Sequence, residues 1–588
     1  MKYAELADVY EKLEKTSKRL EKTSILSDFL KETTAEDVDK IILLLQGKVF
    51  PAWDERKIGF ASRMMIKSIQ TATGMSADSV EKKLKKTGDL GITGEELIVK
   101  KSQQTLFSSE LTVKKVFDNI QKLTTLEGEG SVNRKVSLVA ELLTSAKPKE
   151  ARYIIRTVLE DLRVGLGEGT IRDAIVWAFF WDEIGISYDP KENKITFPEK
   201  NRENYTYFAD MVQAAYDAAN DFSVVAKAAK KDGEKGLKEI GMVIGQPVKV
   251  MLAQKVTTVA EGFEKVGKPA AVEYKYDGFR IQVHRDKDKI ELFTRRLENV
   301  TKQFPEVVKA VKDQTEKSKF VLDTEAVGYD PETKKYMPFQ NISQRIKRKY
   351  DIEKMAKNFP VEVNVFDIAY YKNVNTLKMP FSERRKLIER VVTPKRWSIV
   401  LAKQIITDNN SEAEKFYKEA LENSQEGVMM KKLDAPYKPG SRVGYMVKVK
   451  PTMKELDLVI VGAEWGSGKR AGWLSSFVLA CRDEENDKLL EVGKVGTGIK
   501  EKEEEGMSFE QLTEILKPNI ISEKGKEVKI KPCLVVEVTY EEIQKSPTYS
   551  SGYALRFPRF LRLREDRAPE EASTLDMVKA FYEEQRNR

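Results

Sequence analysis

Histidine and cysteine are almost absent from this sequence of 588 residues, which contains one histidine, His284, and two cysteines, Cys481 and Cys533. Structural zinc sites need Cys and His ligands at short spacings, and small disulfide-stapled domains need many cysteines. Neither pattern is present. The sequence therefore excludes a Cys/His zinc site and a disulfide scaffold. It indicates a protein of the reducing interior of the cell.

Long apolar runs, internal repeats and low-complexity segments are also missing. The N-terminal residues, Met1 to Glu5, contain no apolar signal core. No later run approaches the roughly 18 apolar residues that a membrane helix needs. We therefore expect a soluble, intracellular and cytoplasmic protein without a membrane partner.

Charged residues, in contrast, are abundant. They make up 33% of the chain, and Lys plus Arg exceed Asp plus Glu by 102 to 93. This mild excess is compatible with a polyanionic partner but does not require one, because binding of a polyanion depends on where the charges lie on the surface. High charge with little Cys or His is typical of heat-adapted proteins, so we expect a thermophilic protein.

The hydrophobic pattern changes twice along the chain, which is long enough for three or four domains. Apolar residues recur at helical spacing up to about residue 220, as in Leu6, Val9, Tyr10 and Leu13. From about residue 270, short runs such as 320–322 and 361–366 alternate with charged helical stretches such as 381–392, which predicts a mixed α/β domain. After Pro451, runs such as 458–461, 476–479 and 533–538 predict a small β-barrel.

Lys275 lies in residues 273–280 (EYKYDGFR), which read as a strand that runs into a turn. A lysine with the usual pKa of about 10.4 is protonated at neutral pH and has no lone pair with which to attack. Nearby cations would lower the pKa of Lys275, and the candidates are Arg280, Lys448 and Lys450. If Lys275 attacks a phosphorus atom, the protein is a nucleotidyltransferase.

Further polar segments follow Lys275, each at or beside an apolar run: Thr294-Arg295-Arg296, Asp323-Thr324-Glu325, Gln425-Glu426-Gly427 and Lys448-Val449-Lys450. Arginine can hold phosphate or ribose, and two carboxylates with a polyphosphate suit Mg²⁺. Phe366, which we expect to end a strand before Asp367, could stack on a purine. Lys448 and Lys450 would face the same way on a strand, and with Arg442 they form a cationic cluster.

The order of these motifs resembles that of the covalent nucleotidyltransferases, and the whole chain resembles the ATP-dependent DNA ligases of the archaeal and eukaryotic replicative type. The resemblance implies a multidomain fold. An all-α N-terminal DNA-binding domain would span residues 1–220. An α+β nucleotidyltransferase, or adenylation, domain would span 221–450, and a C-terminal OB-fold β-barrel would span 451–588.

The resemblance also implies an activity, which is the sealing of nicks in double-stranded DNA during replication, repair and recombination. ATP would donate AMP to Lys275, giving a covalent lysine-AMP and then a DNA-adenylate. Mg²⁺ would be the metal, with Mn²⁺ as an alternative, and the enzyme would act as a monomer. The implied site roles are adenine reading by Glu273, stacking by Phe366, binding of ribose, phosphate or the nick by Arg280, Arg295 and Arg442, metal binding by Glu325 and Glu426, and neutralisation of the α-phosphate by Lys448 and Lys450.

Three segments outside the central domain extend the resemblance. In residues 162–171 (LRVGLGEGTI), glycines would let the backbone approach DNA, and Thr170 with Asp173 would open a helix whose amides can hold a phosphate. Residues 103–107 (QQTLF) resemble a sliding-clamp-binding motif. Residues 555–567 resemble the last ligase motif, which orients pyrophosphate, although Arg567 replaces the usual lysine.

Two other classes of protein share parts of this pattern. An RNA ligase or a GTP-using capping enzyme shares the Lys-x-Asp-Gly motif, but the helical region of about 220 residues before Lys275 argues against both. A DNA-binding clamp adaptor with a degenerate core would have lost Lys275 or a carboxylate, and neither is lost. The sequence does not distinguish ATP from ADP or NAD⁺ as the AMP donor, because the adenylate pocket is common to all three.

Overall fold

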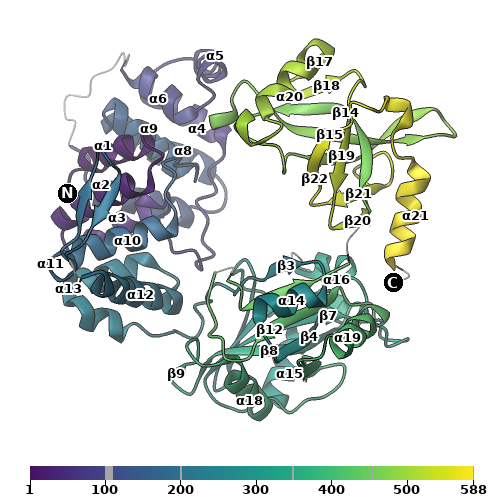
Figure 1. Cartoon of the computed structure of the whole chain (residues 1–588). Helices are drawn as coiled ribbons and strands as arrows, with labels where there is room; N and C mark the ends of the chain where they lie inside the picture. Colours follow the sequence, from purple (N-terminus) through teal and green to yellow (C-terminus); the bar gives the residue numbers. More distant parts are fainter. Residues whose placement is uncertain are drawn as a thin grey trace. The chain divides into compact units, whose positions relative to one another are not determined.

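The computed structural model (Figure 1) describes residues 1–99, 110–198, 201–346, 348, 350–440, 443–451 and 454–586. The chain divides into two compact units. Unit 1 comprises Met1–Gln254, Lys265–Asp408 and Met430–Val447, and unit 2 comprises Lys255–Glu264, Asn409–Met429 and Lys448–Arg588. Among the described residues, none of the helices combines the length and the apolar character needed to cross a membrane.

The first part of unit 1 is helical, as its apolar spacing predicts. Its helices are α1 (Tyr3–Glu14), α2 (Arg19–Glu32), α3 (Val38–Leu45), α4 (Ser62–Thr73), α5 (Ala77–Thr87), α6 (Leu90–Ile98), α7 (Val113–Lys122), α8 (Ser131–Ser145), α9 (Pro148–Val158), α10 (Glu168–Phe179), α11 (Trp181–Ile184), α12 (Asn201–Ala219) and α13 (Phe222–Glu239). In α1, Leu6, Val9, Tyr10 and Leu13 are all buried. The periodicity did not indicate one short hairpin, formed by β1 (Ser187–Asp189) and β2 (Lys194–Thr196).

Two sheets form the mixed α/β part of the chain. The six-stranded sheet has the order β10-β8-β7-β5-β6, with β9 paired to β8, and the five-stranded sheet has the order β11-β4-β12-β13-β3. The strands are β3 (Gln254–Val256), β4 (Ala270–Lys275), β5 (Phe279–Asp286), β6 (Lys289–Thr294), β7 (Phe320–Gly328), β8 (Val361–Tyr371), β9 (Val374–Asn375), β10 (Ile399–Leu401), β11 (Gln404–Thr407), β12 (Gly427–Lys432) and β13 (Met446–Val449). The helices are α14 (Val259–Val266), α15 (Pro305–Gln314), α16 (Phe339–Ile346), α17 (Ile352–Asn358), α18 (Phe381–Val391) and α19 (Asn410–Glu422).

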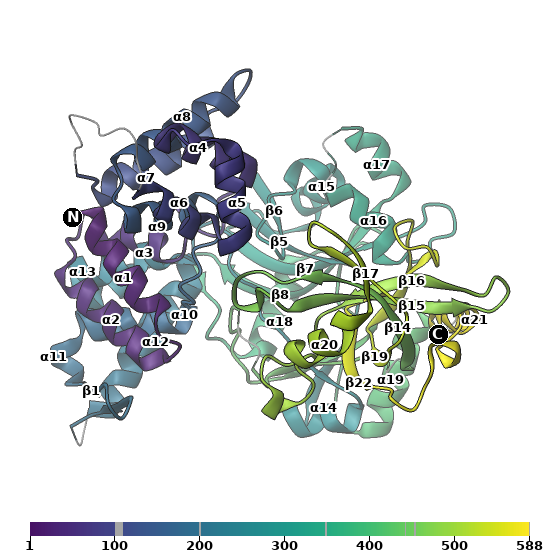
Figure 2. The same ribbon diagram turned by 90° about the horizontal axis from the view of Figure 1, so that it is seen from above.

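The antiparallel strands β5, β7 and β8 lie side by side at the centre of the six-stranded sheet (Figure 2). The predicted runs 320–322 and 361–366 begin β7 and β8. The expectation that the strand ends at Phe366 was wrong, because β8 continues through Asp367 to Tyr371. A buried carboxylate is tolerated there because Arg384 of α18 donates two hydrogen bonds to Asp367, at 2.7 and 3.1 Å.

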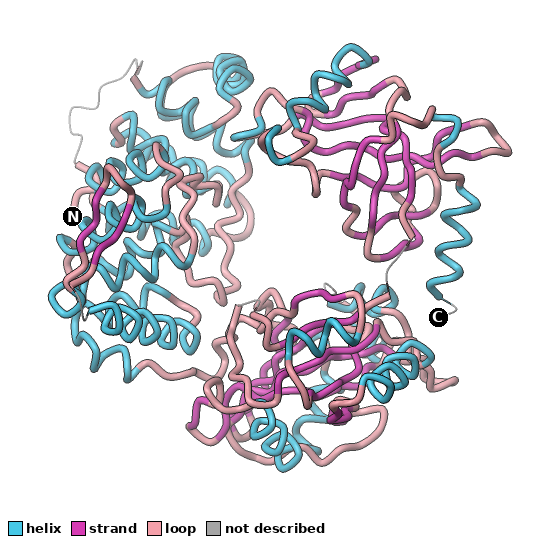
Figure 3. The backbone as a smooth tube through the Cα atoms, viewed as in Figure 1, coloured by secondary structure: helices cyan, strands magenta, loops and turns pink. Residues whose placement is uncertain are grey.

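Unit 2 contains the predicted β-barrel of OB-fold type, drawn mainly as strands in Figure 3. Its elements are β14 (Leu456–Trp465), β15 (Leu474–Asp483), β16 (Lys488–Val495), β17 (Ile520–Lys524), β18 (Glu527–Ile530), β19 (Val535–Thr539), β20 (Glu542–Lys545), β21 (Tyr553–Arg556), β22 (Arg559–Leu563), α20 (Phe509–Leu516) and α21 (Leu575–Arg586). In β14, alternate residues Leu456, Leu458 and Ile460 enter the main core of the unit. Both cysteines are free; Cys481 is buried in this core and Cys533 is exposed.

The single histidine of the chain, His284, is fully buried on β5. The backbone N–H of Gly245 donates to its Nδ1 at 3.1 Å, and the ring of Phe293 meets the imidazole edge-on with centroids 4.9 Å apart. Burial, reinforced by Lys289, lowers the pKa of His284 to about 3. The ring is therefore neutral, and its proton is on Nε2 because Nδ1 accepts a hydrogen bond.

We predict that His284 of the folded protein does not titrate between about pH 8 and pH 4, although a histidine in an unfolded chain has a pKa of about 6.5. A folded pKa below the unfolded one means that the contribution of His284 to stability is complete above about pH 6.5 and is lost as the pH falls towards 3. NMR of protein carrying ¹³C-labelled histidine gives one imidazole signal to follow. The urea-unfolded protein is the control, and a midpoint near 6 in the folded protein would contradict the prediction.

Candidate functional site

Four strands that are otherwise almost entirely buried each keep one candidate residue partly accessible. Lys275 is the half-buried last residue of β4, and Arg280 is the half-buried second residue of β5. Glu325 interrupts the buried run of β7, and Phe366 interrupts that of β8. Of these four residues, Arg280 and Phe366 line the cleft described below, whereas Lys275 and Glu325 are not among its lining residues.

The turn after Lys275 carries the chain from the five-stranded sheet, which contains β4, into the six-stranded sheet, which contains β5. Gly278 occupies this turn because it lies against β7. A Cβ atom at Gly278 would collide with the Ala326 carbonyl oxygen and would lie 3.1 Å from Cγ of Glu325. The glycine of the Lys-x-Asp-Gly motif thus lets the turn approach the backbone of a neighbouring strand.

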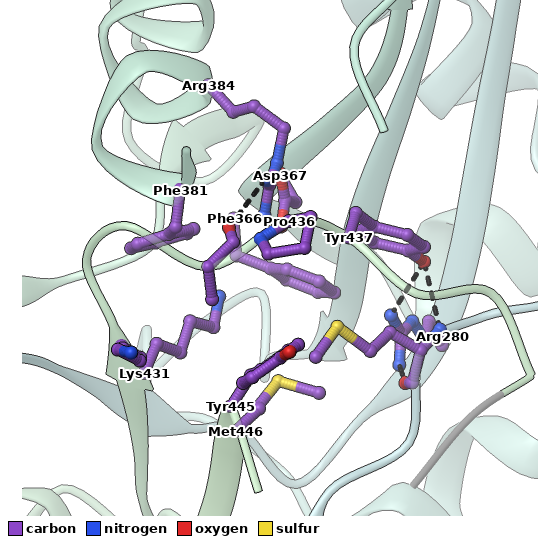
Figure 4. A pocket seen from close by; sticks show the side chains of 13 residues that line it. Arg280, Phe366, Asp367, Phe381, Arg384, Lys431, Pro436, Tyr437, Tyr445 and Met446 are labelled. Carbon is purple, nitrogen blue, oxygen red and sulfur yellow. Dashed lines mark hydrogen bonds and ion pairs between the residues drawn. The ribbon is translucent and has the colours of Figure 1, made fainter. Parts of the chain in front are cut away.

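A cleft enclosing about 310 Å³ lies beside these strands in unit 1 (Figure 4). Its lining combines apolar and cationic side chains, contributed by Met251, Arg280, Phe366, Asp367, Phe381, Arg384, Lys431, Lys432, Ala435, Pro436, Tyr437, Tyr445 and Met446. Aromatic rings between cations suit a flat base that carries phosphate.

Arg280 is fixed at one end of the cleft by buried partners. It donates to both carboxylate oxygens of Asp323, at 2.8 and 2.5 Å, and to the Met251 carbonyl oxygen at 2.9 Å. The Tyr437 hydroxyl donates to Asp323 at 2.6 Å and accepts from Arg280 and from the Met251 backbone N–H. Burial alone would lower the pKa of Arg280, but the Asp323 carboxylate outweighs it and raises this pKa.

Phe366 lies between two cations. The Arg280 guanidinium is 5.1 Å from its ring centroid, and the Lys431 ammonium is 4.8 Å from it. Lys431 is also 4.5 Å from the centroid of Phe381, and its ammonium lies 2.5 Å from Oε2 of Glu273. The structure therefore brings Arg280 and Phe366 to one cleft, whereas Glu273 is not among its lining residues and is linked to it through Lys431.

The two candidate metal carboxylates lie in different surroundings. Glu325 is paired across the antiparallel ladder with Arg280. Glu426, just before β12, forms an ion pair with Lys450, just after β13. The described residues contain no cluster of three or more His, Cys, Asp or Glu side chains that could hold a metal ion. The donor set fits Mg²⁺, which usually takes only one or two protein carboxylates when phosphates supply other ligands.

The remaining candidates lie outside the cleft or outside the described chain. Arg295 follows β6 and is exposed. Lys448 is a half-buried residue of β13, and Lys450 comes directly after that strand. Arg442 and the segment 103–107 lie outside the described residues.

Among the cleft residues that sequence reasoning missed are Lys431, Tyr437 and Met251. Lys431 gave a signal that could have been used, because it directly follows the apolar run Val428-Met429-Met430 within a strand. A lysine in a buried strand is rare unless it is paired. Tyr437 and Met251 gave none, because both lie in irregular segments whose position depends on the tertiary fold.

A glycine-rich turn precedes α10 in the helical part of unit 1. Helix α10 begins at Glu168 after Gly167, so the expectation that Thr170 opens it was wrong by two residues. Lys22, which is buried, donates to the carbonyl oxygens of Val164 and Gly165 at 2.6 and 3.0 Å. These bonds from α2 fix a turn that is rich in glycine, so its conformation is set by the fold.

Within unit 2, Arg564 is surrounded by carboxylates. It donates to both oxygens of Asp457, at 3.0 and 2.9 Å, and to Asp566 at 2.9 and 2.8 Å. Arg567 lies 3.0 Å from Asp457. The hydrogen bond from Arg564 lowers the pKa of Asp566. The last candidate motif is therefore an ion-pair network in this structure.

Comparisons with known proteins agree along the chain. The family profile described as "DNA ligase N terminus" matches residues 2–176, "ATP dependent DNA ligase domain" matches 250–450, and "ATP dependent DNA ligase C terminal region" matches 470–567. The chain is 48% identical to a DNA ligase of Nanoarchaeum equitans over 588 residues, which is 100% of the chain and 99% of the relative. It is 43% identical to a DNA ligase of Thermococcus fumicolans, covering 99% of the chain and 98% of the relative.

A solved structure named "Pmar-Lig_Pre." aligns with a TM-score of 0.55 and 17% identity, covering 95% of this chain and 99% of that one. At this identity the likeness concerns the fold alone.

Tyr437→Phe removes the hydroxyl that bridges Asp323, Arg280 and the Met251 backbone. We predict that it weakens binding of a purine nucleotide about tenfold, because a hydrogen bond to a charged group contributes about 1.5–3 kcal/mol and its loss leaves Asp323 with one partner fewer. Calorimetric titration measures the dissociation constant. Tyr370→Phe is the matched control, since Tyr370 of β8 does not line the cleft and its hydroxyl bonds to Asn373, in the turn after β8. Equal affinities of wild type and Tyr437→Phe would contradict the role of the Tyr437 hydroxyl as the bridge between these groups.

Proposed function

Because the chain belongs to the ATP-dependent DNA ligase family, we propose that Lys275 is the nucleophile with which it seals nicks in double-stranded DNA. The protein is a DNA ligase that uses ATP as AMP donor and a divalent metal such as Mg²⁺. The observation that carries the assignment of Lys275 is its position at the half-buried end of β4, in the turn that joins the two sheets.

In the first step, Nζ of Lys275 attacks the α-phosphorus of ATP. A phosphorus–nitrogen bond forms, the bond to the β-phosphate oxygen breaks, and pyrophosphate leaves. The attack requires the neutral amine, so Lys275 must lose a proton first. Positive charge from Lys448 and Lys450 would favour that loss and would neutralise the α-phosphate.

In the second step, an oxygen of the 5′-phosphate at the nick attacks the same phosphorus, and Nζ of Lys275 leaves, which gives a DNA-adenylate. In the third step, the 3′-hydroxyl attacks the 5′-phosphorus and AMP leaves. The enzyme contributes position and fixed charge to these displacements, which is how phosphoryl-transfer sites usually act.

The cleft would hold the nucleoside. Phe366 would stack on the adenine, Glu273 would accept from its amino group, and Arg280 would bind ribose or phosphate. The support is that Arg280 is held by Asp323 and Tyr437 before any ligand binds, so little entropy is lost on binding. Glu325 and Glu426 would hold Mg²⁺, whose charge would stabilise the transferring phosphate. The same ligands would accept Mn²⁺ as an alternative metal.

Contacts to DNA would come from two regions. The turn at Gly165 and the first amides of α10 would hold phosphates of the duplex without reading sequence, which suits an enzyme that acts at any nick. Arg295, which is exposed after β6, and Arg442 would bind the nick or the nucleotide phosphates.

Several finer assignments complete the proposal. Residues 1–220, 221–450 and 451–588 would be the three domains, and residues 103–107 would dock a sliding clamp, which raises the local concentration of the enzyme at nicks. The enzyme would act as a monomer inside the cell, with the chromosome, in replication, repair and recombination. The nicked duplex as substrate supports this location.

We predict that Lys275→Ala abolishes covalent labelling by α-labelled ATP. Protein is incubated with α-labelled ATP or GTP and Mg²⁺ without nucleic acid, separated by denaturing electrophoresis and then chased with nicked DNA. Wild type should carry an acid-labile label from ATP that disappears as the nick is sealed. Lys448→Ala should fold normally and transfer AMP more slowly.

Lys302→Ala, which changes an exposed lysine of the same unit, is the matched control and should label like wild type. A labelled Lys275→Ala protein would refute the assignment of the nucleophile. Label from GTP alone would indicate capping chemistry, and the absence of label from either nucleotide would favour the clamp-adaptor alternative.

A further inference from the structure

One face of β5 binds an irregular segment of chain, residues 245–251, which we call the strap. Alternate residues of a strand point to the same side, so Gln282 and His284 share this face. Nδ1 of His284 accepts the backbone N–H of Gly245 at 3.1 Å. The side-chain amide of Gln282 donates to the carbonyl oxygen of Val248 at 2.7 Å and accepts the N–H of the same residue at 3.2 Å. The strap is therefore held as a neighbouring strand would be, although residues 245–251 form no strand.

The side chains that hold the strap are buried polar groups. Gln282 and His284 are 2% and 0% exposed, and positions buried to this extent usually carry apolar residues. A buried amide or imidazole costs free energy unless it is hydrogen-bonded, and the backbone groups of an irregular segment need partners as well. The two side chains and the strap satisfy each other, which fixes the strap in one position on β5.

The last residue of the strap, Met251, reaches the cleft. Its carbonyl oxygen accepts from the Arg280 guanidinium at 2.9 Å, and its N–H donates to the Tyr437 hydroxyl at 3.1 Å. All three residues line the cleft (Figure 4). A shift of the strap would therefore displace a hydrogen-bond partner of Arg280.

Other residues of the strap bind the helical part of unit 1. Nδ2 of Asn220, which is buried, donates to the carbonyl oxygen of Pro247 at 3.0 Å. Lys249 forms an ion pair with Glu168, the first residue of α10, and its ammonium lies 5.6 Å from the ring centroid of Tyr216. The strap is therefore bonded to β5 and to the helical part at the same time.

We propose that the strap couples the binding of nicked DNA by the helical part to the binding of the nucleotide at the cleft, with Lys249 and Gln282 as positioning residues. Lys249 and Met251 are two residues apart, so about 7 Å of extended chain joins the contact with α10 to the contact with Arg280. A nucleotide that fixes Arg280 would also fix the strap and α10, so DNA would then bind with a smaller loss of entropy. By linkage, DNA would raise the affinity for the nucleotide by the same factor. This inference rests on the proposed function, because it assumes that the nucleotide occupies the cleft and that the helical part binds DNA.

The test measures the affinity for AMP by calorimetric titration, with and without a saturating nicked duplex. The duplex carries a 5′-hydroxyl at the nick, so no AMP transfer can follow, and the protein is first treated with pyrophosphate, which reverses the first step and empties the site. The ratio of the two dissociation constants is the coupling factor. We expect this factor to be about fivefold or more in wild type, as is typical of coupled sites. It should fall to within twofold of one in Lys249→Met, which loses the ion pair with α10, and in Gln282→Met, which loses both bonds to Val248.

Lys238→Met is the matched control, because it breaks an ion pair with Glu234 that lies within α13 alone, and it should keep the coupling factor of wild type. A merely structural role of the strap would change the separate affinities and leave the factor unchanged. An unchanged factor in Lys249→Met would overturn the inference, even if Gln282→Met does not fold, and so would a factor of one in wild type. Failure of wild type to bind AMP or the duplex at all would instead refute the proposed function.

Discussion

The Arg280 guanidinium lies between strands that are buried on both faces, where an unpaired charge would cost several kcal/mol. Asp323, whose side chain is 2% exposed, supplies the opposite charge from the neighbouring strand, and Tyr437 closes the pair. Phe366 then packs beside a cation that cannot move away. The shape of one end of the cleft follows from this single pair, because each neighbour is placed by contact with it.

The two sheets explain why the cleft lies where it does. β4 belongs to one sheet and β5 to the other, so the short turn between them must cross from sheet to sheet. Only glycine fits at position 278, against the backbone of β7. A lysine at the end of β4 is therefore delivered to the junction of the sheets, close in sequence to the arginine that begins the next strand. The glycine of the Lys-x-Asp-Gly pattern is therefore a requirement of this crossing.

Much of this arrangement could be predicted from the sequence, because strands buried on both faces leave strong local signals. The runs that begin β7 and β8, and the polar residues that interrupt them, were visible in the sequence. The partners of those residues were not. The strand was predicted to end at Phe366, before Asp367, because the residue that neutralises Asp367, Arg384, lies on a separate helix. Tyr437 reaches Asp323 across more than a hundred residues, and no periodicity encodes such a contact.

The cleft and the glycine-rich turn would recognise their ligands by opposite physical means, which matches what a ligase needs. At the cleft, Arg280 is held by Asp323 and Tyr437, so the charge offered to a nucleotide would be fixed before binding. At the turn, Lys22 donates to backbone carbonyl oxygens. The groups offered to DNA would be backbone amides, which bind phosphates, and phosphates are the same at every position of a duplex. Under the proposed function, the nucleotide would be recognised by fixed side chains and the duplex by backbone amides, so binding of DNA would not depend on its sequence.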